Sequence, residues 1–179
     1  MKKKVFAIAL ALTALLAFTA CGDGDEKVID NKTGSTTGSD SETSTDGFVF
    51  EINGVSLPIG AEADDLIEAL GEAKSVYEVP SCAFGDLDVI YTYAGFDVET
   101  YQEDSVNYIS SISLTDDSVS TPEGLSLGDS YDKIAELYGE PTSDDGATVL
   151  YRFTDMKLMI LVEDDAITSI QYLNTLLDE

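Results

Sequence analysis

The side chains able to do chemistry in this 179-residue chain are almost all carboxylates. The sequence holds 35 Asp and Glu residues, nine Lys and Arg, two Cys and no His. Without His, the Ser-His-Asp and Cys-His nucleophile systems and imidazole metal sites are excluded. Two carboxylates can hydrolyse glycosides if they face each other across a cleft and one has a raised pKa, but the sequence singles out no such pair. We therefore predict a non-enzymatic protein without a cofactor.

The acidic residues gather in short clusters that separate strand-like runs. Asp is common in turns because its side chain bonds to nearby backbone, so these clusters read first as turns. Calcium is the ion that such oxygens could hold, but an EF-hand needs further ligands and a distal Glu at fixed spacing. We predict no metal site, and calcium binding stays open as an alternative. The turn clusters are Asp86-x-Asp88, Asp116-Asp117, Asp144-Asp145 and Glu163-Asp164-Asp165. Asp23-Gly24-Asp25 also hints at calcium, but we favour a solvated tether there.

Cys21 has the clearest chemistry of the two cysteines. It follows three lysines and the apolar run Val5 to Ala20, the layout of an export signal. The stretch Phe18-Thr19-Ala20-Cys21 resembles the bacterial lipobox, with Phe in place of the usual Leu. That resemblance implies a signal peptide over residues 1–20, removed after a diacylglyceryl group is attached to the Cys21 thiol. An uncleaved anchor is disfavoured, because 16 residues of helix rise about 24 Å and a membrane core is about 30 Å thick.

Residues 21–47 are predicted to form an acylated Cys and a disordered tether. Gly22 to Gly47 is built mainly from Gly, Asp, Ser, Thr, Glu, Lys and Asn, and it cannot bury a core. The remaining body, residues 48–179, carries 28 acidic and 4 basic residues. So negative a body repels nucleic acid and anionic lipid. We predict no nucleic acid partner and attachment to the extracytoplasmic face of the cell membrane through the lipid on Cys21.

Cys82 is the one thiol left once Cys21 is acylated. An intramolecular disulfide is then excluded, and with no His to activate the thiol we favour an inert Cys over a nucleophile or an intermolecular bridge.

The body contains two similar halves, about residues 54–115 and 124–173. Each begins with a short apolar stripe of helical spacing, near residues 63–70 and 131–138. Gly71 and Gly139 then end the helices as left-handed C-caps, and Asp129 or Ser130 would cap the second helix. Three strand-like runs follow in each half, joined by turns such as Ala94-Gly95 and Thr154-Asp155. One further strand precedes them, and the strands are Phe48–Ile52, Asp88–Tyr93, Phe96–Tyr101, Tyr108–Thr115, Thr148–Phe153, Met156–Val162 and Ala166–Leu173.

A helix followed by a three-stranded meander, twice, resembles the β-lactamase inhibitory protein (BLIP) family and the related small outer-membrane lipoprotein (SmpA/OmlA) domains. The phrase Tyr138-Gly139-Glu140-Pro141 carries the likeness best, since Ala73 replaces the Pro in the first half. The resemblance implies an α+β fold in which two helix-plus-antiparallel-meander repeats form one curved antiparallel sheet, with the helices on one face. It also implies that the open face binds another protein.

Strand alternation predicts which side chains line that open face. They mix apolar groups with two of the four cations of the body, as a protein-binding patch does. We predict the partner-binding residues to be Ile90, Tyr101, Leu150, Arg152, Lys157, Met159 and Leu161. The chain itself could instead cover this face, or a second copy could pack on it.

These observations predict a lipid-anchored, cell-surface, non-enzymatic protein-binding module of bacterial origin. Inhibition or regulation of an envelope or extracellular protein is a special case that only the resemblance suggests. The alternative is a solute- or calcium-binding envelope lipoprotein.

Overall fold

The computed structural model describes residues 47–81, 87–176 and 178. The predicted signal peptide, Cys21, the tether up to residue 46, Asp86 and Cys82 lie outside the described residues.

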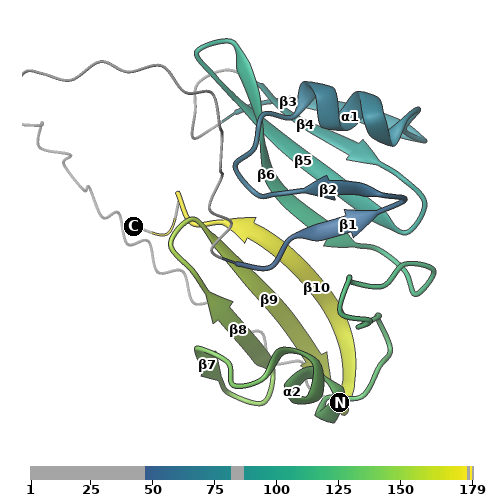
Figure 1. The fold of residues 1–179 in the computed structure, drawn as a ribbon, viewed down its shortest axis with the longest axis vertical. Helices are drawn as coiled ribbons and strands as arrows, with labels where there is room; N and C mark the ends of the chain where they lie inside the picture. The colour runs from purple at the N-terminus through teal and green to yellow at the C-terminus, as the bar shows by residue number, and fades with distance from the viewer. Residues whose placement is uncertain (1–46, 82–86, 177, 179) are drawn as a thin grey trace, which may run out of the picture. The chain divides into compact units, whose positions relative to one another are not determined.

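Ten strands make two antiparallel sheets (Figure 1). The small sheet pairs β1 (Phe50–Ile52) with β2 (Val55–Leu57). The large sheet has eight strands in the order β3-β4-β5-β6-β10-β9-β8-β7. Its strands are β3 (Ser75–Pro80), β4 (Leu87–Thr92), β5 (Phe96–Glu103), β6 (Val106–Leu114), β7 (Ser143–Asp144), β8 (Thr148–Arg152), β9 (Met156–Glu163) and β10 (Ala166–Asn174).

Tight turns set the register of the hairpins, and both predicted hairpin turns are confirmed. The Tyr93 amide donates to the Phe96 carbonyl at 2.9 Å across Ala94-Gly95, and the Phe153 amide donates to the Met156 carbonyl at 2.9 Å across Thr154-Asp155. The turn between β9 and β10 uses Asp164 and Asp165 at φ 51° and 66°. Positive φ at both central residues suits a two-residue hairpin, and Asp tolerates it better than most residues do.

The strands β6 and β10 each contain a bulge, in both cases at the repeated Ile-Ser/Thr-Ser-Ile motif. Ser110 and Thr168 are the extra residues that pairing skips. The Ser110 hydroxyl donates to the Glu99 carbonyl at 3.0 Å, and the Thr168 hydroxyl donates to the Leu161 carbonyl at 3.3 Å. Without a bulge, two Ile residues three apart would face opposite sides of a strand. The extra residue turns both of them inward, and Ile109, Ile112, Ile167 and Ile170 are all buried.

The predicted α+β class is wrong, and the protein is mostly β. The two helices of the described residues, α1 (Asp64–Leu70) and α2 (Asp132–Tyr138), have seven residues each. A helix of that length spans about 10 Å, whereas eight strands at about 4.8 Å spacing span about 34 Å. α1 buries none of its side chains and α2 buries Ile134 alone. The helices therefore do not form a layer over the sheet.

The β1–β2 hairpin covers the centre of that face instead, where it lies in front of the large sheet in Figure 1. Phe50 and Leu57 are both 0% exposed. The Phe50 ring lies 5.4 Å from the Phe96 ring and 5.7 Å from the Tyr172 ring, so it contacts both halves of the sheet. The hairpin thus covers the core face of the sheet, which the helices were predicted to cover.

The predicted helix ends are partly right. Gly71 and Gly139 end the helices with positive φ, but their ψ values of -160° and -149° are not those of a left-handed cap. The N-terminus of α2 has no side-chain cap. The Asp129 carboxylate accepts instead from the Ser126 amide at 2.8 Å and from the Lys133 ammonium at 2.7 Å, so it does not cap the helix.

Candidate functional site

The predicted site residues all lie on one face of the large sheet, opposite the β1–β2 hairpin. Residues directly opposite each other on neighbouring strands share a face. Leu150 pairs with Met159, Arg152 with Lys157, and Ile90 with Glu99. We call this surface the open face.

The structure separates the seven residues into two groups. Ile90 and Tyr101 belong to β4 and β5, whereas the other five belong to β8 and β9. Three strands lie between β4 and β9, a separation of about 19 Å. The intervening row of the open face is largely polar, with Ser113 and Gln171 paired at the junction of the two halves. The open face therefore does not present one continuous apolar patch.

Tyr101 is buried despite its place on the open face, with 5% of its surface exposed. Its ring stacks on Tyr108 at 5.5 Å. Burial is the largest cause that raises the pKa of the Tyr101 phenol, with Glu103 and Tyr108 adding to it. A side chain with so little exposed surface contributes little direct contact to a partner.

Four residues of the second group line a shallow groove of about 430 Å³ over β7, β8 and β9, and the fifth, Leu161, does not. Leu150 and Met159 provide apolar surface there, and both are half-buried. The Leu150–Met159 pair lies two residues along the strands from the Arg152–Lys157 pair, so the two pairs are neighbours on the same face. The groove therefore places two cations beside an apolar floor, and its lining is Ser143, Asp144, Asp145, Thr148, Leu150, Arg152, Lys157, Met159 and Asp178.

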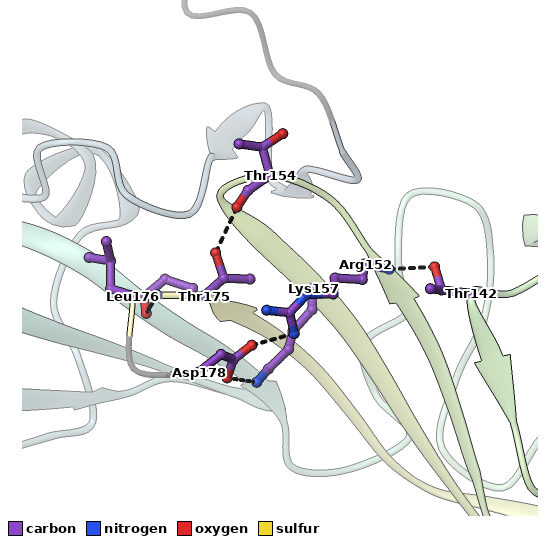
Figure 2. Close-up of polar contacts among 8 residues, drawn as sticks. Thr142, Arg152, Thr154, Lys157, Thr175, Leu176 and Asp178 are labelled. Atoms are coloured by element: carbon purple, nitrogen blue, oxygen red, sulfur yellow. Dashed lines mark hydrogen bonds and ion pairs between the residues drawn. The ribbon is translucent and has the colours of Figure 1, made fainter.

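One carboxylate of the chain joins the two cations. The Arg152 guanidinium donates to Asp178 Oδ2 at 2.6 Å, and the Lys157 ammonium donates to Oδ1 at 2.5 Å (Figure 2). These contacts come from residues 26 and 21 positions apart. The hydrogen bond from Lys157 is the largest cause that lowers the pKa of the Asp178 carboxyl, with Arg152 acting in the same direction. The groove thus holds an ionised carboxylate between two cations.

Hydrogen bonds join Thr175 and Asp178, described residues of the same segment, to the chain around them. The Thr175 hydroxyl donates to the Thr154 carbonyl (Figure 2), a distance of 2.8 Å, and the Thr175 amide donates to the Asp155 backbone carbonyl at 3.2 Å. The Asp178 amide donates to the Thr175 carbonyl at 3.2 Å. Leu176 is 57% exposed and does not line the groove. The segment therefore rests on the sheet through polar contacts.

Two further carboxylates line the groove but bond to their own turn. Asp144 accepts from the Tyr131 hydroxyl and from the Gly146 amide, the latter at 2.8 Å. Asp145 accepts from the amides of Ala147 at 3.0 Å and Thr148 at 2.7 Å. Backbone donors are also the main cause that lowers the pKa of the Asp145 carboxyl. Within the described chain, the ion pairs of Arg152 and Lys157 are those to Asp178.

Sequence reasoning missed Asp178 as a site residue. Its neighbourhood, Leu-Leu-Asp-Glu at the end of the chain, carries no motif or period that would assign it to a strand face. The one available signal was electrostatic, since two cations on one face of so acidic a body attract a nearby carboxylate. Chemically, the arrangement can bind a carboxylate through charge-assisted hydrogen bonds and place an apolar group next to it.

Two other kinds of feature are absent from residues 47–81, 87–176 and 178. No group of three or more His, Cys, Asp or Glu side chains in this part of the chain is placed to hold a metal ion. No helix there is long and apolar enough to cross a membrane.

No protein-family model and no curated protein matches the chain. Among solved structures, it is similar to a cysteine-rich secretory protein from Staphylococcus aureus subsp. aureus Mu50, with 14% identity and a TM-score of 0.44. The match covers 64% of this chain and 44% of that protein, so it spans less than half of the other protein's length. A likeness this distant carries no argument about function.

Proposed function

We propose that this chain is a lipid-anchored, extracytoplasmic, non-enzymatic module that binds another protein through the groove of its open face. The observation that carries the proposal is the groove over β7–β9, where Arg152 and Lys157 border the half-buried Leu150 and Met159. Exposed apolar groups beside charges are typical of protein-binding surfaces. Ile90, Tyr101 and Leu161 do not line this groove, so the proposed site is narrower than the one predicted from sequence.

The anchoring half of the proposal rests on the sequence. The resemblance of residues 18–21 to a lipobox supports acylation of Cys21, and the acidic body supports attachment by lipid alone. The measurement is fractionation of cells producing wild type or Cys21→Ala. We expect wild type in the membrane fraction and the variant in the soluble fraction, and a variant that still sediments with membranes would contradict acylation as the anchor.

The binding half is tested by site-specific photocrosslinking in the intact, lipidated protein. A photoreactive residue at Met159 is compared with one at Val76, which is 54% exposed on edge strand β3. We expect a discrete adduct from position 159 that is absent at position 76. The adduct partner is then purified and its Kd measured against wild type and Arg152→Gln/Met159→Ser, which we expect to bind at least tenfold more weakly. Equal Kd values would refute the groove as the binding site.

The same preparations separate a binding module from a solute- or calcium-binding lipoprotein. A ligand that binds the folded state alone raises Tm by mass action. We expect no rise in Tm with millimolar calcium, and a clear rise that is lost on substitution of acidic residues would favour the alternative. Inhibition of an extracellular enzyme, which only the likeness to BLIP suggests, is tested on the purified partner if that partner is an enzyme.

A further inference from the structure

The cationic pair of the groove is already occupied by the chain's own carboxylate. Residues 48–179 carry only four basic residues, and two of them meet at Asp178. The other carboxylates of the groove, Asp144 and Asp145, accept from a Tyr hydroxyl and from backbone amides of their own turn. Asp178 therefore occupies the position at which a partner's acidic side chain would bind.

Among the described residues of the segment that carries Asp178, only Asp178 lines the groove, and it contacts the two cations. Leu176 is 57% exposed and lies outside the lining, while Leu150 and Met159 stay half-buried below. Figure 2 shows Leu176 and Asp178 extending to different places, with only Asp178 reaching the cations. A partner that supplies both a carboxylate and an apolar side chain would make contacts that Asp178 alone does not.

The spacing of the two sets of contacts matches an extended peptide. Arg152 and Leu150 are two residues apart on β8, and Lys157 and Met159 are two apart on β9. Two residues of strand rise about 6.8 Å, which is also the distance between side chains i and i+2 of an extended segment. A segment with an acidic residue at one position and an apolar residue two positions away therefore fits both.

We propose that the groove recognises an apolar-x-acidic segment of a partner protein, and that Asp178 is an intramolecular competitor which the segment displaces. This inference rests on the proposed function, because it takes the groove as the binding site and names the chemistry of its partner. Displacement breaks two exposed ion pairs and the few hydrogen bonds of Thr175. A short tether holds a competitor at an effective concentration in the millimolar range, so removing it should raise apparent affinity.

The probe is a fluorescein-labelled, amidated peptide TLLDE, which presents Leu two positions before Asp. Within the chain this Leu is held out of the groove by the turn in which the Asp178 amide donates to the Thr175 carbonyl, whereas the free peptide can bind in an extended form. Its Kd for the full lipidated chain in detergent is measured by anisotropy with wild type, Asp178→Asn and Arg152→Gln/Lys157→Gln. We expect Asp178→Asn to bind more tightly than wild type by one plus the ratio of the competitor's effective concentration to its own Kd, which is about tenfold for about 1 mM and about 0.1 mM. We expect the double variant, and wild type with the control peptide TLLNQ, to show no saturable binding. Matched thermal melts verify that each variant is folded.

Each outcome decides the inference. Equal Kd values for wild type and Asp178→Asn overturn the competitor, and binding that survives Arg152→Gln/Lys157→Gln overturns carboxylate recognition by these cations. Free N-acetyl-aspartate amide that competes as well as the peptide overturns recognition of a protein segment in favour of a small carboxylate. If the two variants fold but the chosen peptide binds neither wild type nor Asp178→Asn, the apolar-x-acidic specificity is overturned. The proposed function fails separately, because it depends on crosslinking at Met159 and not on this peptide.

Discussion

Replacing Phe50 with Ala tests whether the β1–β2 hairpin, and not the helices, closes the core. The side chain is 0% exposed and contacts rings from both halves of the sheet. Truncation to Ala removes about 150 Å² of buried apolar surface, or about 4 kcal/mol at about 25 cal/mol per Å². That agrees with the roughly 3–5 kcal/mol typical of Phe-to-Ala changes in cores.

The matched control is Leu66→Ala in α1. Leu66 packs against the same core but is only partly buried, and α1 contains no buried residue. Removing a side chain that is partly in water costs less, here about 1 kcal/mol. For a domain of this size, each kcal/mol shifts Tm by roughly 3–4 °C, so we expect about 14 °C for Phe50→Ala and about 4 °C for Leu66→Ala.

The assay is thermal and urea unfolding followed by circular dichroism on the same preparations. Urea midpoints with an unchanged m-value would show that stability changed and not the unfolded state. A loss for Leu66→Ala equal to or larger than that for Phe50→Ala would refute the reasoning, because it would mean that α1 covers more of the core than the hairpin does.

Three further predictions concern single contacts. The pKa of the Asp178 carboxyl lies below its ordinary 3.8, so its ion pairs stabilise the fold above about pH 4 and are lost as pH falls through the lowered pKa. NMR titration should show this pKa rising in Lys157→Gln. An unchanged pKa would disprove the contact between Lys157 and Asp178. Ser110→Ala should lower the free energy of unfolding by about 1 kcal/mol through loss of the bulge hydrogen bond. Deleting Ser110 should leave the protein folded, because Ile109 and Ile112 would then lie two residues apart and share the buried face without a bulge; a deletion variant that urea titration finds unfolded would contradict Ser110 as the extra residue. Gly95→Ala should lower the free energy of unfolding by about 3 kcal/mol and Gly54→Ala by about 1 kcal/mol. Both glycines have positive φ, but of the two only at Gly95 would a Cβ meet side-chain atoms at 2.6 Å. Equal losses of stability in thermal melts would argue against close packing at Gly95.

Local patterns of the sequence were sufficient for the hairpins. Apolar residues alternate on both sides of the turn Ala94-Gly95 and on both sides of the turn Thr154-Asp155. This alternation determines the pairing of the strands, because a two-residue turn leaves one register in which the apolar faces agree. The short strands β2, β3 and β7 were missed. Two or three residues hold too little periodicity for β2 and β7, and edge strand β3 is almost entirely exposed, so no buried face imposes a pattern on it.

The fold class was wrong for a related reason. Helical periodicity near residues 63–70 and 131–138 is real and gives two helices, but a stripe on a short helix does not say how much of a sheet it covers. The cover comes from Phe50 and Leu57, whose positions in a three-residue strand carry no sign that they would pack across both halves of a larger sheet.

The candidate site divides in the same way between local and long-range information. By itself, the sequence determined which side chains share the open face, since alternation is a property of the backbone. It also determined that Arg152 and Lys157 stand out, because charges can be counted. Only the tertiary structure decided that Tyr101 is buried, that Ile90 lies about 19 Å from the groove, and that Asp178 binds both cations. These are contacts between distant parts of the chain, and they follow from how the strands assemble and where the chain end comes to lie, which no local pattern of residues encodes.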